Sequence, residues 1–190
     1  MIGALKVVTK PAILAAEVAD AKSHLGVTHD EDSRRLYELG ELAVDRVQSF
    51  TSRQLVTATY DYYLDQFPSG RVLELPLAPL SSVTSVKYQD LDDAQQTFAS
   101  SNYDVFTRDD EPGFVELKQD KQWESTYDKS DAVVVRFVCG YGTDRLAVPA
   151  PLRQATLLYT QVDYDPVADR AQIERAAEDL MWPFRLAEVG

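Results

Sequence analysis

Side chains that commonly bind transition metals are scarce in this chain, which contains two histidines and one cysteine. A tetrahedral zinc site draws most of its ligands from such residues, so His24, His29 and Cys139 would all have to meet at one point. His24 is expected near the end of a helix, where a histidinium interacts favourably with the helix dipole. Cys139 ends an apolar run and is expected to be a small buried side chain. The sequence therefore predicts no metal site and no cofactor.

Carboxylates are abundant and gather in three clusters, Asp90/Asp92/Asp93, Asp109/Asp110/Glu111 and Asp163/Asp165/Asp169. A calcium loop of the EF-hand type needs glycine at its sixth position and glutamate at its twelfth. Counted from Asp163, these positions hold Ala168 and Glu174, so the required glycine is missing. Aspartate also favours turns and helix caps, and we interpret the three clusters as solvated turns.

The sequence lacks the short motifs of common catalytic sites, namely a Gly-x-Ser-x-Gly elbow, a phosphate-binding loop and a dinucleotide fingerprint. The run Gly140-Tyr141-Gly142 is too short to form any of them. A glycosidase would need two carboxylates facing one cleft, and nothing in the sequence marks out such a pair. The sequence therefore predicts a protein that is not an enzyme, with a carboxylate-based hydrolase as a less favoured alternative.

The net charge is strongly negative, since 19 basic and 31 acidic residues give −12. Residues 56–148 hold 8 basic and 16 acidic residues, a net charge of −8, so most of the acidity lies there. Tight nucleic-acid binding needs clustered Lys and Arg, and anionic membranes attract basic segments, so the charge argues against both partners. The N-terminal residues lack a signal-peptide pattern, and we expect a soluble protein made in the cytoplasm.

Two groups of aromatic side chains are candidates for binding. An exposed face of Tyr60, Tyr62 and Tyr63 would suit a sugar or host ligand, but tyrosines in strands more often fill a sheet face, which we favour. The C-terminal run Leu180–Phe184 is rich in Met, Trp and Phe, types that are enriched at protein interfaces. Packing on the protein's own core is our first interpretation of this run, and an anchor on a neighbouring subunit is the second.

Helical periodicity is present at both ends of the chain. The apolar stripes are Leu14/Val18/Ala21/Leu25, Leu36/Leu39/Ala43/Val47/Phe50, Leu152/Ala155/Tyr159/Val162 and Ile173/Ala176/Ala177/Leu180/Met181. Gly26 is expected to cap the first helix at its C-terminus. Asp165-Pro166 is expected to open the last helix, because aspartate caps helix N-termini and proline suits the first helical position.

The middle of the chain shows the alternation and turn residues of strands. Strands are expected at 60–64, 72–75, 83–88, 96–98, 103–106, 114–117 and 133–138. The last of these, Val133–Val138, is the most apolar and is expected to lie at the centre of a sheet. Two hairpins are expected, one turning at Asp90–Ala94 and the other at Asp109–Gly113.

This order of elements predicts an α+β fold. Residues 1–55 are expected to form an N-terminal helical pair, 56–148 an inserted and mostly antiparallel β lobe, and 149–190 a C-terminal helical pair. The two pairs together would complete a four-helix core.

A set of segments in a fixed order carries a family resemblance. They are Ala15–Val27, Asp30–Asp32 at the start of the long helix, Phe50–Leu55, Leu75–Leu80 with Ser82–Val86, Gly140–Gly142 and Val148–Ala155. Each segment alone is weak, but their joint order is specific and spans nearly the whole chain. Together they resemble the head–tail connector family, the adaptor or head-completion proteins of tailed bacteriophages and gene-transfer particles. The part from Asp163 onward is the least similar.

The resemblance implies a non-enzymatic virion protein in the neck between head and tail. Such proteins form a ring, typically of twelve copies, below the portal protein. The ring extends the DNA channel and docks the next component, a stopper or tail-completion protein. DNA would pass without specific binding, which negative charge favours because it repels phosphate. A head-to-tail ring also needs two different complementary faces on each subunit.

Candidate site residues are hypotheses from composition, because the family has no short signature that transfers residue by residue. Candidates for contact with the portal or a neighbouring subunit are Leu180, Met181, Trp182 and Phe184. Candidates for an acidic loop facing the lumen or the next neck component are Asp109, Asp110 and Glu111. The alternative function is a phage-associated β module that binds a host or sugar ligand through the Tyr60–Tyr63 face.

Overall fold

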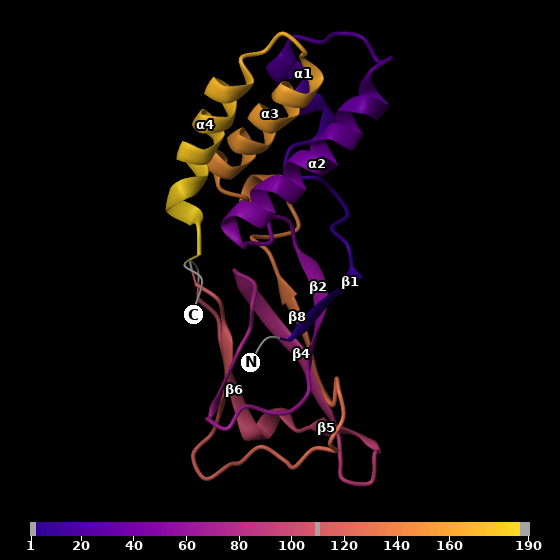
Figure 1. Ribbon diagram of the computed structural model, residues 1–190, viewed down its shortest axis with the longest axis vertical. Coiled ribbons are helices and arrows are strands. Elements are labelled where there is room, and N and C mark those ends of the chain that lie inside the picture. Colours follow the sequence, from indigo (N-terminus) through magenta and orange to yellow (C-terminus); the bar gives the residue numbers. More distant parts are fainter. Residues whose placement is uncertain (1–2, 109–110, 187–190) are drawn as a thin grey trace. The chain divides into compact units, whose positions relative to one another are not determined.

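The computed structural model describes residues 3–108 and 111–186. The chain divides into two compact units, each built from segments far apart in the sequence (Figure 1). The β unit comprises Thr57–Gly140 and the described residues of Met1–Lys10. The helical unit comprises Pro11–Val56 and the described residues of Tyr141–Gly190.

A five-stranded antiparallel sheet forms one layer of the β unit. Its strand order is β1-β2-β8-β4-β5. The strands are β1 (Ala4–Thr9), β2 (Ala58–Leu64), β8 (Val133–Cys139), β4 (Leu80–Gln89) and β5 (Gln95–Phe98). The apolar strand β8 lies in the middle of this order, which confirms its predicted central position.

A three-stranded antiparallel sheet forms the second layer. Its order is β3-β7-β6, with β3 at Val72–Glu74, β7 at Phe114–Leu117 and β6 at Tyr103–Phe106. The pairing of β6 with β7, and that of β4 with β5, confirm the two hairpins expected from the sequence.

The inner faces of the two sheets share one hydrophobic core. Alternation along β8 buries Val133, Val135 and Phe137 completely, since successive side chains of a strand point to opposite faces. The three-stranded sheet contributes Leu73 and Val115 to the same cluster. Each sheet therefore has one face in the core and one open face.

The helical unit packs four α-helices around a second core. They are α1 (Val18–Leu25), α2 (Ser33–Thr51), α3 (Ala150–Tyr164) and α4 (Arg170–Met181), and a short 3₁₀ turn at Trp182–Phe184 follows α4. The core draws Ala43 and Val47 from α2, Leu152 and Ala155 from α3, and Met181 from α4. Among the described residues the structure thus confirms the α+β fold, with a helical core made by both ends of the chain.

Local signals place the helix ends. Gly26 adopts the left-handed conformation at φ 69° and caps α1, as predicted, because glycine has no Cβ to hinder that conformation. Asp165 differs from its prediction, since it ends α3 rather than opening α4. The Asp169 carboxylate accepts a hydrogen bond from the Gln172 backbone N–H and is the N-cap of α4.

The N-terminal strand β1 was not expected from the sequence. Residues 4–9 fall within the expected helical segment 1–55, but they pair antiparallel with β2 at the edge of the five-stranded sheet. All six side chains of β1 are exposed, so the strand lacks the apolar alternation that marks a buried one. Its partner also lies far along the chain, and no local pattern indicates that pairing.

Candidate interaction surfaces

The two histidines have structural partners. His24 Nε2 lies 2.9 Å from Gln161 Oε1, a contact that joins α1 to α3. His29 Nδ1 lies 3.0 Å from a carboxylate oxygen of Glu31. Within residues 3–108 and 111–186, no three His, Cys, Asp or Glu side chains come together as a metal site would need.

Cys139 is fully buried in the core of the β unit. Burial disfavours the charged thiolate and raises the pKa of the Cys139 thiol from 9.0 to about 12. A nucleophilic cysteine needs a lowered pKa and access to substrate, so Cys139 has neither property and serves as a packing residue.

Two of the acidic clusters have structural roles. In the β4–β5 turn the Asp90 carboxylate accepts hydrogen bonds from the backbone N–H groups of Asp92 and Ala94, both at 3.0 Å, and from Gln96 Nε2 at 2.7 Å. These hydrogen bonds lower the pKa of Asp90, and the bond from Gln96 has the largest effect. In the helical unit Asp163 pairs with Arg46 at 2.8 Å and Arg170 at 3.0 Å.

The third acidic cluster is only partly described, because Asp109 and Asp110 lie outside the described residues. Glu111 is exposed and pairs with Arg108 at 2.5 Å. The Arg108 guanidinium lies 4.9 Å above the Phe114 ring, which stacks on Phe106 with ring centres 4.8 Å apart. Glu111 is therefore held beside an aromatic pair on the three-stranded sheet.

The tyrosines of β2 do not share one exposed face. Tyr62 is buried, and Tyr60 packs against the core and stacks on Phe137 with ring centres 5.9 Å apart. Tyr63 points to the opposite face, as alternation requires. The Tyr60–Tyr63 platform needed by the alternative β-module function is therefore not formed.

The C-terminal candidates separate into buried and exposed side chains. Met181 is completely buried in the helical core, and Leu180 and Phe184 are half-buried against it. Trp182 is 65% exposed. Of the four residues, Trp182 alone presents a largely free apolar surface, because the other three pack on the protein's own helices.

The segment around Trp182 is fixed to the C-terminal end of α2. The Trp182 ring lies 6.4 Å from that of Phe50, and the Arg185 guanidinium lies over both rings at 5.7 and 5.6 Å. Arg53 Nε donates a hydrogen bond of 2.5 Å to the Phe184 carbonyl, and the Leu186 N–H donates one of 3.1 Å to the Thr51 carbonyl. The exposed indole therefore lies beside Phe50 and Arg185, on a segment that hydrogen bonds tie to the end of α2.

The open face of the five-stranded sheet is basic at its centre. Strand register places Lys6, Asp61 and Arg136 in one cross-strand row. The neighbouring row contains Tyr63, Val134 and Lys87. Sequence reasoning missed this surface, because it depends on the pairing of β1, β2, β8 and β4 rather than on any one segment.

Asp61 is the carboxylate at the centre of that face, and it is covered by Arg136. The Arg136 Nε and Nη2 atoms each donate a hydrogen bond of 2.8 Å to one carboxylate oxygen of Asp61. The Arg136 hydrogen bond lowers the pKa of Asp61 despite its burial, and the charges of Arg136, Lys6 and Lys87 lower it further. Both lysines therefore act on the same face as the ion pair.

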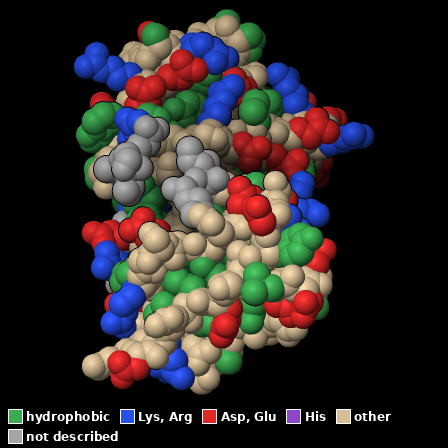
Figure 2. All heavy atoms as spheres, turned by 60° about the horizontal axis from the view of Figure 1, so that its bottom comes forward, with side chains coloured by type: hydrophobic (Ala, Val, Ile, Leu, Met, Phe, Trp, Pro, Cys, Tyr) green, Lys and Arg blue, Asp and Glu red, His purple; other side chains and the backbone are tan. Residues whose placement is uncertain are grey.

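The open face of the three-stranded sheet is acidic and aromatic. Register places Val72, Glu116 and Asp104 in one row, and Glu74, Phe114 and Phe106 in the next. Val72 is 38% exposed and Phe106 is 42% exposed. On the molecular face drawn in Figure 2, acidic side chains form several separate groups between basic and apolar ones. The negative charge of the sheet face comes from Glu74, Glu116 and Asp104.

None of the helices in the described residues is both long and apolar enough to cross a bilayer. Neither a protein-family model nor a curated protein matches the chain.

Solved structures of gene transfer agent (GTA) particles match along nearly the whole length. A chain from the neck of an empty GTA particle, computed with C6 symmetry, has a TM-score of 0.82 at 20% identity, covering 98% of this chain and 97% of that one. A chain from the virion of a native GTA particle has a TM-score of 0.81 at 21% identity, with the same coverage. A chain from the neck of a native GTA particle, computed with C12 symmetry, has a TM-score of 0.79 at 21% identity, again with that coverage. At these identities the likeness establishes a shared fold.

Proposed function

We propose that this chain is a structural protein of the neck of a tailed phage or gene-transfer particle. It acts as a head–tail adaptor, made in the cytoplasm of the host and built into the virion below the portal protein. The observation that carries the proposal is the shared fold over 98% of this chain and 97% of a chain from a GTA neck, at a TM-score of 0.82. The match extends over both units rather than one common module.

A ring of identical copies suits this role. The similar chains come from necks computed with C6 and C12 symmetry, and a component of such a neck is present in several copies around one axis. Rotationally arranged copies that join head to tail close into a ring. We therefore propose a ring of this chain, of twelve copies, that extends the DNA channel and docks a stopper or tail-completion protein.

The charge of the chain supports passage of DNA rather than binding. A net charge of −12 gives a surface that repels phosphate at short range. Tight binding to DNA would require clustered cations that neutralise several phosphates. DNA that slides through an acidic ring therefore meets no cluster of cations that would bind it tightly.

Two contacts are proposed for the neighbours in the neck. Trp182 is the contact to the portal protein, because it is an exposed indole, and tryptophan rings are frequent centres of binding energy. The turn that carries Glu111 faces the lumen or the next neck component.

Deletion of the gene from the genome that encodes the particle tests this function. Without an adaptor, heads would package DNA but could not join tails, so electron microscopy should show full heads and free tails. Complementation with the wild-type gene should restore joined particles. Tailed particles at the wild-type yield in the deletion strain would overturn the proposal.

A further inference from the structure

The β unit carries two open sheet faces of opposite charge. We propose that the basic face of the five-stranded sheet in one copy docks on the acidic face of the three-stranded sheet in a second copy of this chain. This inference rests on the proposed ring and names the surfaces that join its subunits. Each face is thus covered by the complementary face of another copy of this chain.

The basic face has cations available for a partner. Lys6 and Lys87 form no ion pair with any residue in the described part of the chain, whereas Arg136 is engaged with Asp61. Both lysines are near enough to Asp61 to lower its pKa, which places them around one centre. The charge of Asp61 is compensated by Arg136, so the two lysines remain to attract carboxylates from outside.

The acidic face has two carboxylates available for a partner, as many as the lysines available on the basic face. Glu74 and Glu116 form no ion pair within residues 3–108 and 111–186, whereas Asp104 lies 3.6 Å from Lys118. Glu74 pairs in register with Phe114, and Glu116 pairs with Val72 on the same face. Two glutamates that form no ion pair within the described residues therefore complement two lysines that form none there on the other face.

Apolar side chains accompany the charges on both faces. Tyr63, Val134 and Val138 are partly exposed on the basic face. On the acidic face Val72 and Phe106 are exposed, and Phe114 is covered only in part by Arg108. Stable interfaces combine an apolar centre with a polar rim, so both faces have the composition that docking requires.

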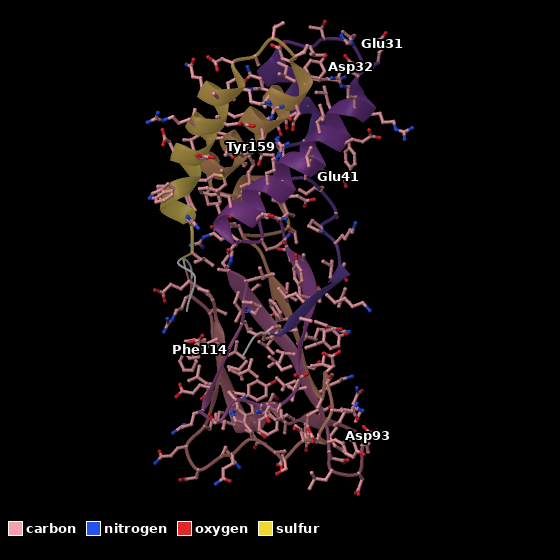
Figure 3. The ribbon with its side chains drawn as sticks, in the orientation of Figure 1. Glu31, Asp32, Glu41, Asp93, Phe114 and Tyr159 are labelled. Carbon is pink, nitrogen blue, oxygen red and sulfur yellow. The ribbon has the colours of Figure 1, made fainter. Side chains whose placement is uncertain are left out.

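The two faces point away from each other within the β unit. Leu73 and Val115 of one sheet and Val86 and Val135 of the other lie in a shared core, so the opposite face of each sheet is turned outward. Figure 3 shows Phe114 at the outer left of the β unit. Figure 1 shows β6 on that side and β1 on the opposite side. Two different and outward faces give head-to-tail contacts, which close into rings when the rotation between copies allows.

Pairing through the sheet edge is disfavoured by the features of β1. Lysines and bulges on an edge strand oppose the addition of another strand. β1 carries Lys6, and its register with β2 shifts between Val7 and Thr9. Docking through the faces therefore fits the structure better than extension of the sheet.

Charge reversal on one face at a time tests the inference in the full chain. Variant A combines Lys6→Glu with Lys87→Glu, and variant B combines Glu74→Lys with Glu116→Lys. Sedimentation velocity at about 10 mM salt, where the Debye length is roughly 30 Å, measures the self-association of each protein. Matched controls with the same changes in net charge are Lys121→Glu with Arg175→Glu and Glu124→Lys with Asp128→Lys, four exposed side chains outside both faces.

The wild-type chain and both controls should self-associate. Variants A and B should each associate more than roughly 100-fold more weakly, because like charges would meet across the interface. A mixture of A and B should associate again, since both faces of A are then acidic and both faces of B are basic. Circular dichroism should show that A and B remain folded.

Three results would overturn the inference. They are a wild-type chain that stays monomeric up to roughly 1 mM, variants that associate like the wild type, and a mixture of A and B that fails to associate. None of these results by itself removes the proposed neck function, which the gene deletion tests separately. Conversely, tailed particles without the gene would remove the neck function while face-to-face association could still be observed.

Discussion

Arg136 holds Asp61 with two parallel hydrogen bonds of 2.8 Å between β8 and β2, at the centre of the open face of the five-stranded sheet. The Asp61 side chain is only 8% exposed, so its charge depends on this partner. A two-point contact between a guanidinium and a carboxylate fixes direction as well as distance. The pair therefore links the two strands at the centre of this face and compensates the charge of the buried Asp61 carboxylate.

Replacement of this carboxylate should change how stability depends on pH. Asp61→Asn should lower the free energy of unfolding at pH 7 by about 1–2 kcal/mol. The folded-state pKa of Asp61 lies below its ordinary value of 3.8, so its stabilising contribution is present above that value and is lost as pH falls through the folded pKa. The difference between variant and wild type should therefore shrink below about pH 4, as measured by urea unfolding.

The exposed Asp128 provides a control for that experiment. Asp128→Asn should leave stability within about 0.5 kcal/mol of the wild type at every pH. A difference between Asp61→Asn and wild type that stays constant from pH 7 to pH 3 would contradict the role of the ion pair.

The thiol of Cys139 should be unreactive until the β unit unfolds. A rise in pKa from 9.0 to about 12 lowers the thiolate population at neutral pH by roughly 1000-fold, and burial removes access as well. The colour reaction with Ellman's reagent should therefore be slow in buffer and fast in concentrated urea. Equal rates in the two solutions would show that Cys139 is accessible in the folded protein.

Trp182 and Met181 are neighbours in sequence but should give opposite results. Trp182→Ala should change stability by no more than about 0.5 kcal/mol, because the indole is exposed. The same substitution should abolish binding to the portal protein, because it removes the proposed contact. Met181→Ala should cost about 2–5 kcal/mol in stability, because it leaves a cavity in the helical core. Thermal unfolding and a portal pull-down measure the two effects.

Leu146 is a matched control for Trp182, since it is 62% exposed and belongs to the same unit. Leu146→Ala should bind the portal like the wild type. Normal portal binding by Trp182→Ala would remove the proposed anchor. Removal of the chain from Leu180 onward is a poorer test, because it also removes the buried Met181.

Alanine substitutions at Gly26 and Gly70 measure the cost of backbone strain at Gly26, because neither position is sterically crowded. A Cβ at either position would meet no atom within 4 Å, but only Gly26 of the two has a left-handed φ, at +69°. Gly26→Ala should therefore destabilise the protein by about 1 kcal/mol, whereas Gly70→Ala should remain within about 0.5 kcal/mol of the wild type. Equal effects of the two substitutions in chemical denaturation would contradict the assignment of Gly26 as a strained helix cap.

Much of the fold could be predicted because its signals are local. The hairpin of β6 and β7 was expected at the residues where it occurs, because alternating side chains flank a polar turn. The core position of Val133, Val135 and Phe137 follows from the same period of two. Helix α1 and its cap at Gly26 follow from the period of 3.6 and from the conformational freedom of glycine, although α1 begins at Val18 and Leu14 of the predicted stripe lies before it.

The remaining features depend on contacts between distant residues. β1 is fully exposed, and its partner lies more than 40 residues away in sequence. Asp165 and Asp169 are both good N-caps by residue type, and only the structure shows which one the helix uses. The same holds for the open sheet faces, because Lys6 and Lys87 come together only when β1 and β4 occupy the same sheet.

Native mass spectrometry of the wild-type chain, alone and mixed with the portal protein from the same genome, tests the central claim most directly. We expect a complex in which a ring of twelve copies of this chain joins the portal at a fixed ratio. Trp182→Ala should lack that complex, and Leu146→Ala should form it. A wild-type chain that stays monomeric both alone and with the portal would contradict the proposed role as a neck adaptor.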